Sequence, residues 1–130
     1  RHVFALVPSP ALGLCCDPSH MIRQLIDPYE PLEEFAQRII YVHAKDTELV
    51  RQRMNDVGIN GKGWWRFRLP GLGDLHWVRW LRTLREVGYD GLLSIEHEDQ
   101  QWVGSPEIIV AGLKYSRTYL QACLDEIARP

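Results

Sequence analysis

Short apolar runs and polar segments follow one another along this chain in a repeating order. Each apolar run ends at a polar residue, and a loop and then a helical pattern follow. The runs cover residues 13–16, 39–42 and 91–95, and the polar residues at their ends are Asp17, His43 and Glu96. The second run is apolar on both faces, as in a parallel strand that is covered on both sides. This alternation predicts an α/β fold with a parallel sheet and outer helices.

Helical patterns connect the predicted strands. Asp27 followed by Pro28 is a typical start for a short helix. Asp74 is expected to cap the next helix, whose apolar stripe includes two tryptophans and which ends at Gly88. Residues 105–127 predict a final amphipathic helix that begins with a Ser-Pro-Glu sequence.

Residues 46–73 are predicted to form a long loop region with one short helix over 48–56, because glycines and prolines punctuate the segment. Loops of this length are usually functional. Arg66 and Arg68 precede a Pro-Gly sequence, and a guanidinium in such a loop can bind a carboxylate, a phosphate or sugar hydroxyls, although either residue could be an ordinary surface arginine. Trp65 could form one wall of a sugar pocket or pack on neighbouring helices.

The polar residues at the strand ends are the candidates for chemistry. Functional groups of parallel α/β folds lie at the carboxyl ends of strands, so Asp17, His43 and Glu96 are expected to converge at one rim, with His20 nearby. Two carboxylates and an imidazole suit a divalent ion such as manganese, magnesium, cobalt or zinc. Each residue also has a purely structural interpretation: a turn at Asp17, a helix cap at His20, a core histidine at His43, and a solvated acidic loop at Glu96.

Composition narrows the possible classes of protein. The chain has 130 residues with 15 Lys+Arg and 17 Asp+Glu, so its formal net charge is −2. This balance gives no argument for binding nucleic acid. Apolar runs of four or five residues are far below the ~20 needed to span a membrane. Three cysteines do not make a disulfide framework, and reduced thiols favour a cytoplasmic protein.

Length predicts that residues 1–130 form a single partial domain. A complete barrel commonly needs about 200–250 residues, and three strand–helix units cannot close one. The chain begins with Arg1 rather than Met, so we expect a fragment or a processed chain. An open sheet has exposed edges that invite association. A non-catalytic subunit that binds a partner through such an edge is therefore one hypothesis, and homo-oligomerisation stays open.

Four motifs in order carry a resemblance to a known family. They are Asp17-Pro18-Ser19-His20, His43-Ala44-Lys45-Asp46, Arg68-Leu69-Pro70-Gly71-Leu72-Gly73, and Gly88-Tyr89-Asp90-Gly91 leading to Ser94-Ile95-Glu96-His97-Glu98. From about Leu12 to Leu120 the chain resembles the C-terminal part of the xylose isomerase-like (β/α)8 barrels. That family includes sugar isomerases, sugar epimerases, inosose dehydratases and apurinic endonucleases.

The resemblance implies roles for individual residues. Asp17, His43 and Glu96 would bind one divalent ion at the ends of the sixth, seventh and eighth strands of a TIM barrel, and Glu96 would also transfer a proton. His20 would bind a substrate hydroxyl and take part in catalysis. Arg68 would contact substrate, or Arg66 in its place, and Trp65 would be a further binding residue. A further ligand, a Glu from an earlier strand, would come from the missing N-terminal part of the barrel or from a complementary chain.

The resemblance implies an isomerase or epimerase that abstracts a proton alpha to the carbonyl of a sugar or cyclitol. A dehydratase or lyase acting on an inosose or keto-sugar is the alternative, because the same metal and base serve both reactions. The apurinic endonucleases use additional Asp-x-His ligands, and no such sequence occurs between His43 and Pro70. We therefore expect a small-molecule substrate and neither nucleic acid nor membrane as a partner.

Overall fold

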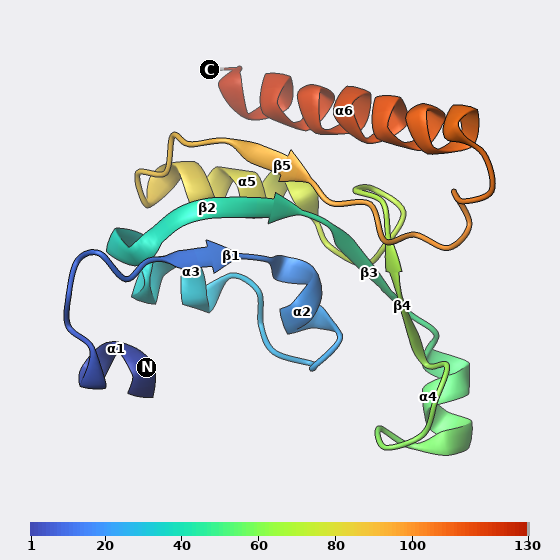
Figure 1. Ribbon diagram of the computed structural model, residues 1–130, viewed down its shortest axis with the longest axis horizontal. Helices are drawn as coiled ribbons and strands as arrows, with labels where there is room; N and C mark the ends of the chain where they lie inside the picture. Colours follow the sequence, from blue (N-terminus) through green and yellow to red (C-terminus); the bar gives the residue numbers. More distant parts are fainter. Residues whose placement is uncertain (130) are drawn as a thin grey trace.

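Three parallel strands form the central sheet. The computed structural model describes residues 1–129, and its sheet has the order β1 (Leu14–Cys16), β2 (Ile39–Ala44) and β5 (Leu93–Ile95). β2 pairs in parallel with both neighbours (Figure 1). The predicted parallel sheet is therefore confirmed, and the strand ends that carry the candidate residues lie side by side.

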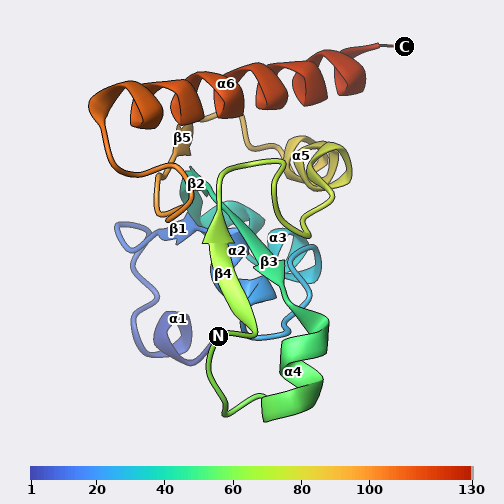
Figure 2. The same cartoon turned by 90° about the vertical axis from the view of Figure 1, so that its right-hand side faces the viewer.

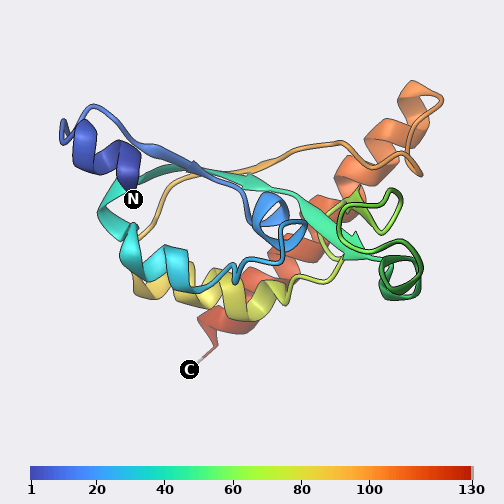
Figure 3. The same ribbon diagram turned by 90° about the horizontal axis from the view of Figure 1, so that it is seen from below.

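Helices cover the outer face of this sheet. Figure 3 shows α3 (Glu30–Glu34) and α5 (Trp77–Glu86) on the same side of the strands. The last helix, α6 (Pro106–Ala128), packs on α5 and on β5. Apolar side chains from the helices and the sheet form one core, whose buried members include Val42, Trp77, Trp80, Leu84 and Leu120. Among the described residues, no helix is long and apolar enough to cross a membrane.

The helix starts differ in part from those the sequence predicts. Ser105 caps α6 as predicted, because its side chain accepts a hydrogen bond from Ile108 N. The cap of α5 is His76 rather than Asp74. The Asp74 carboxylate instead accepts a hydrogen bond from Leu49 N at 2.6 Å. A carboxylate near a helix start can satisfy a loop N–H instead of the helix, and sequence spacing does not separate the two cases.

The connection between β1 and β2 also differs from the prediction. A short helix, α2 (Pro18–Ile22), begins directly after β1 with Asp17 as its cap. The helix expected from Asp27 onward is α3, and a single turn of 3-10 helix over Ala36–Arg38 follows it. A five-residue helix, α1 (His2–Leu6), precedes β1.

The predicted long loop is largely an antiparallel hairpin. β3 (Asp46–Leu49) pairs with β4 (Trp65–Arg68), and α4 (Arg51–Val57) lies in the connection between them. Figure 2 shows this hairpin extending away from α6 toward α4. The short helix predicted over residues 48–56 is present as α4, but the two strands were not predicted. Asp and Glu in β3 have low strand propensity, and only the pairing with the distant β4 makes this segment a strand.

The fully buried carboxylate of Asp46 connects this hairpin to the rest of the molecule. Its Oδ1 accepts hydrogen bonds from Thr47 N at 2.8 Å and Leu75 N at 3.1 Å, and its Oδ2 accepts from Gly71 N at 3.2 Å and Trp77 Nε1 at 2.8 Å. Burial raises the pKa of Asp46, and these hydrogen bonds oppose that effect. Asp46 is therefore an acceptor that fixes the loop between β4 and α5.

Replacing Asp46 by alanine would leave four donors without their acceptor. Unpaired buried donors cost on the order of 1–3 kcal/mol each, with partial relief by water, so we expect Asp46→Ala to lower the free energy of unfolding by about 3 kcal/mol or more. Urea unfolding measures this loss. Asp125→Ala is the control, since Asp125 is exposed on α6 and bonds only Gln121 among the described residues. Equal stability of the two variants would refute the role of Asp46.

Candidate metal centre

The sheet register brings the three predicted ligands together. Asp17 follows β1, His43 lies near the end of β2, and Glu96 follows β5. Cys16 pairs with Val42, and His43 pairs with Ser94, so the three strand ends are nearly level. One ligand atom from each of Asp17, His43 and Glu96 lies within 4.8 Å of the other two. The expected convergence at one rim is therefore observed.

Asp17 has one satisfied and one unsatisfied oxygen. Its Oδ1 accepts hydrogen bonds from Ser19 N at 2.9 Å and from Ser19 Oγ at 2.6 Å. Its Oδ2 is buried and accepts no hydrogen bond among the described residues. A buried carboxylate oxygen that accepts no hydrogen bond is costly. The helix cap thus orients the side chain through one oxygen and leaves the other facing the cluster, which fits a cation at this point.

Glu96 and His43 complete the donor set. Glu96 Oε2 lies 2.8 Å from His43 Nδ1, and Asp17 Oδ2 lies 3.8 Å from the same nitrogen. About one third of each of the Glu96 and His43 side chains is exposed, so both can be reached from the rim. Two carboxylates and one imidazole at these separations suit a divalent ion of the manganese, magnesium, cobalt or zinc type.

A buried lysine lies against the same carboxylates. Lys45 Nζ is 2.8 Å from Glu96 Oε2, 3.3 Å from Asp17 Oδ2 and 2.5 Å from Glu98 Oε2, and its side chain is 1% exposed. The ammonium also lies 4.4 Å from the centre of the Phe67 ring. Burial lowers the pKa of Lys45, but hydrogen bonds to Glu96 and Glu98 and the charge of Asp17 outweigh it, so the net shift is upward. Lys45 is therefore a permanent cation at neutral pH.

His20 lies beside the candidate ligands. Its Nε2 is 3.5 Å from Asp17 Oδ2, and about half of its side chain is exposed. Its ring meets the Phe67 ring edge to face, with centroids 5.3 Å apart. His20 is therefore adjacent to the cluster and open to the rim, and its role as a substrate contact stays a prediction.

The predicted arginines lie on β4, and neither belongs to the group of three converging ligands. Arg68 is buried, with its Nε 3.2 Å from Asp99 Oδ2. Arg66 is half exposed and forms two hydrogen bonds with Glu48, at 2.8 and 2.7 Å, and the pKa of Glu48 is lowered by this pairing. The substrate-binding roles of both arginines stay predictions, and the observed partners are carboxylates of this chain.

An open pocket lies between the hairpin and the segment after β5. Trp65, Arg66 and Phe67 form one side of this pocket of about 490 Å³, and Glu98 with the glutamines at 100 and 101 lies on the other. Trp65 meets Phe67 edge to face at 5.0 Å. The predicted binding residue Trp65 therefore lines space next to Glu98, which contacts Lys45 of the cluster.

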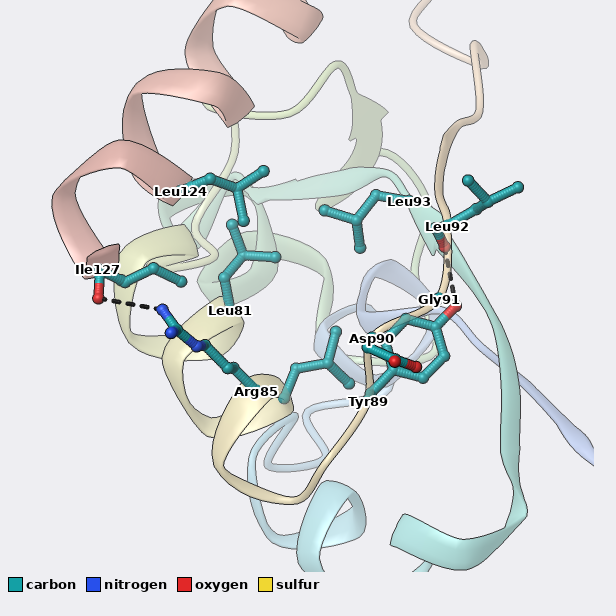
Figure 4. A pocket seen from close by; sticks show the side chains of 10 residues that line it. Leu81, Arg85, Tyr89, Asp90, Gly91, Leu92, Leu93, Leu124 and Ile127 are labelled. Atoms are coloured by element: carbon teal, nitrogen blue, oxygen red, sulfur yellow. Dashed lines mark hydrogen bonds between the residues drawn. The ribbon is translucent and has the colours of Figure 1, made fainter.

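A second pocket lies at the other end of β5 (Figure 4). Leucines from α5, α6 and β5 line it, together with Arg85, which donates to the carbonyl of Ile127 at 3.5 Å. It adjoins the start of β5, whereas Glu96 follows the end of that strand. Because it is mainly apolar and holds none of the candidate ligands, it is separate from the metal centre.

Sequence reasoning gave no role at the site to Lys45 or Phe67. Lys45 stands two positions after His43, so strand alternation alone would have placed both side chains on one face. The contact of Phe67 with Lys45 depends on the β3–β4 hairpin, which the sequence pattern did not predict. Asp99, a possible ligand or proton-transfer group from its position after β5, is buried and accepts hydrogen bonds from Leu69 N and Gln101 N.

Comparison with known proteins decides the family. The sequence model of the xylose isomerase-like TIM barrel family matches residues 1–119. The chain belongs to the xylose isomerase-like TIM barrel family. A crystal structure of a xylose isomerase domain protein from Planctomyces limnophilus superposes with a TM-score of 0.79 at 29% identity, covering 98% of this chain and 43% of that one. The predicted fold class, strands and outer helices of a TIM barrel, is therefore confirmed.

Two named relatives of this xylose isomerase-like chain are enzymes. An inosose dehydratase from Clostridium botulinum is 31% identical over 107 residues, which are 78% of this chain and 36% of that protein. A 3-oxo-isoapionate decarboxylase from Pectobacterium atrosepticum is 36% identical over 74 residues, which are 55% of this chain and 24% of that protein. The chain thus spans well under half the length of the curated relatives it matches.

Arg68 and Arg66 are expected to differ in their effect on stability. Arg68→Met would leave the buried Asp99 carboxylate without its cation, a change that costs about 3 kcal/mol in comparable buried pairs. Arg66→Met removes an exposed pair worth about 1 kcal/mol or less. Parallel chemical denaturation of the two variants measures the difference. If Arg68→Met is no less stable than Arg66→Met, the Arg68–Asp99 pair does not support this wall of the site.

Proposed function

We propose that the protein carrying this chain is a divalent-metal-dependent enzyme that removes a proton alpha to the carbonyl of a sugar or cyclitol. The observation that carries the proposal is the buried Oδ2 of Asp17, which accepts no hydrogen bond among the described residues and lies within a cluster of two carboxylates and one imidazole. Membership of the xylose isomerase-like family supports it. Similarity to two relatives, an inosose dehydratase and a 3-oxo-isoapionate decarboxylase, supports a keto-sugar or cyclitol substrate.

Asp17, His43 and Glu96 are the residues that would hold the ion. When bound, the ion would polarise the carbonyl and bind an adjacent hydroxyl of the substrate, which acidifies the neighbouring C–H bond. We propose manganese, magnesium, cobalt or zinc as the ion.

Glu96 is proposed as the base. Among the described residues, the hydrogen bonds and ion pairs of Glu96 involve Oε2, which leaves Oε1 free to receive a proton. The C–H bond of the substrate breaks, the proton moves to Glu96, and the electron pair forms the enediolate. Lys45 Nζ lies 2.8 Å from Glu96 Oε2 and holds the side chain at the rim by this ion pair.

His20 is proposed to bind the substrate hydroxyl next to the reacting carbon. Return of the proton to the other face or to the neighbouring carbon yields an epimer or an isomer. Delivery of a proton from His20 to a β-hydroxyl instead expels water and yields a dehydrated ketone. The similarity to inosose dehydratase favours this second outcome as the alternative function.

The remainder of the site is proposed to come from another part of the barrel. Ile40 and Leu92 are large apolar residues of the sheet region with 67% and 75% of their surface exposed. Either an upstream segment or a complementary chain would cover such surfaces and supply a further Glu ligand. The 130-residue chain alone is accordingly expected to turn over neither ketoses nor inososes.

Glu96→Gln is expected to abolish turnover while the fold persists. The amide keeps the shape of the side chain but cannot accept the proton, and loss of a general base typically costs about 10²–10⁴-fold in rate. Turnover of inososes and ketohexoses by the full-length protein with Mn²⁺ measures this, and circular dichroism reports the fold. Glu86→Gln on the outer helix α5 is the matched control, with unchanged turnover expected. Retention of activity by Glu96→Gln would remove Glu96 from the mechanism.

A further inference from the structure

The metal centre already contains a cation that belongs to the protein. Lys45 Nζ approaches Asp17 and Glu96, the two side chains that would supply carboxylate ligands, at 3.3 and 2.8 Å. Its side chain is 1% exposed, so water does not screen its charge effectively. An ammonium in this position and a divalent ion therefore compete for the same two carboxylates.

A third carboxylate gives the ammonium an alternative partner. Glu98 Oε2 is 2.5 Å from Lys45 Nζ, and the Glu98 side chain is 45% exposed at the rim. Glu98 is absent from the group of three residues whose ligand atoms converge. When the carboxylates of Asp17 and Glu96 bind an ion, Glu98 can still form an ion pair with Lys45.

The Phe67 ring restricts where the ammonium can go. Nζ lies 4.4 Å from the ring centre, within the range of a cation–π contact. Phe67 belongs to β4, whose hairpin is held in place by Asp46. Lys45 therefore stays beside the ligands whether or not they bind an ion.

From these contacts we propose that Lys45 is a built-in counter-cation that sets the ion affinity of the centre. It holds Asp17 and Glu96 together before the ion arrives, and it weakens the binding of the ion by repulsion and by competition. Glu98 has the opposite effect, because it draws the ammonium away from the ligands. The inference rests on the proposed metal function and adds a positioning role for two residues outside the ligand set.

Opposite changes in Mn²⁺ affinity test this proposal. Titration calorimetry of the full-length protein with Mn²⁺ alone, without substrate, is expected to show binding about tenfold or more tighter for Lys45→Met than for the wild type, because removal of a like charge at this range is worth at least that factor. Glu98→Gln is expected to bind Mn²⁺ several-fold more weakly. Lys114→Met, on the outer helix α6, is the matched control, with unchanged affinity expected.

Thermal unfolding separates this role from a purely structural one. Lys45→Met is expected to lower the melting temperature of the metal-free protein, since three carboxylates lose their cation, and to enlarge the rise in melting temperature on adding Mn²⁺. If Lys45 had only a structural role, its replacement by Met would lower both the stability of the protein and its affinity for Mn²⁺.

The outcomes distinguish the proposal from the function on which it rests. If the wild type binds Mn²⁺ and Lys45→Met binds it equally or more weakly, the role of Lys45 is overturned. If Lys45→Met does not fold, Glu98→Gln decides, and an unchanged affinity in that variant overturns the proposal. If neither the wild type nor any variant binds Mn²⁺, the metal function itself fails.

Discussion

Repulsion between two carboxylates at the end of a parallel sheet is the constraint on which this site depends. Asp17 and Glu96 are held near one another because β1 and β5 flank β2 in nearly level register. In water two such charges would separate. The structure opposes this with a helix cap on one oxygen of Asp17 and with the buried ammonium of Lys45 between the two side chains. Such an arrangement is preorganised for a cation.

The hairpin of β3 and β4 makes this arrangement durable. It places Phe67 under the ammonium and His20 against the Phe67 ring, and Arg68 of the same strand pairs with the buried Asp99. Asp46 then fastens the hairpin to the core through Trp77. A mobile loop could not hold a charged group this close to its partners, so the ordered hairpin connects the packing of the core to the electrostatics of the rim.

Much of this architecture could be predicted from the sequence. The strands, the final helix and the convergence of Asp17, His43 and Glu96 followed from apolar periodicity and from the rule that parallel strands end at one rim. The hairpin could not be predicted from the sequence, because β3 carries Asp46 and Glu48 and is a strand only through its pairing with β4. The burial of Lys45 and the buried pair of Asp99 with Arg68 were not predicted for a related reason: burial of a charge depends on partners that lie far away in the sequence.

The central claim is that Asp17, His43 and Glu96 are ligands of one divalent ion. A crystal structure of the full-length protein grown with Mn²⁺, with data collected at the manganese absorption edge, tests it most directly. The account predicts one anomalous difference peak within coordination distance, about 2.0–2.3 Å, of an Asp17 oxygen, an imidazole nitrogen of His43 and a Glu96 oxygen. An ordered, fully formed rim without a peak, or with the ion bound elsewhere, would contradict it.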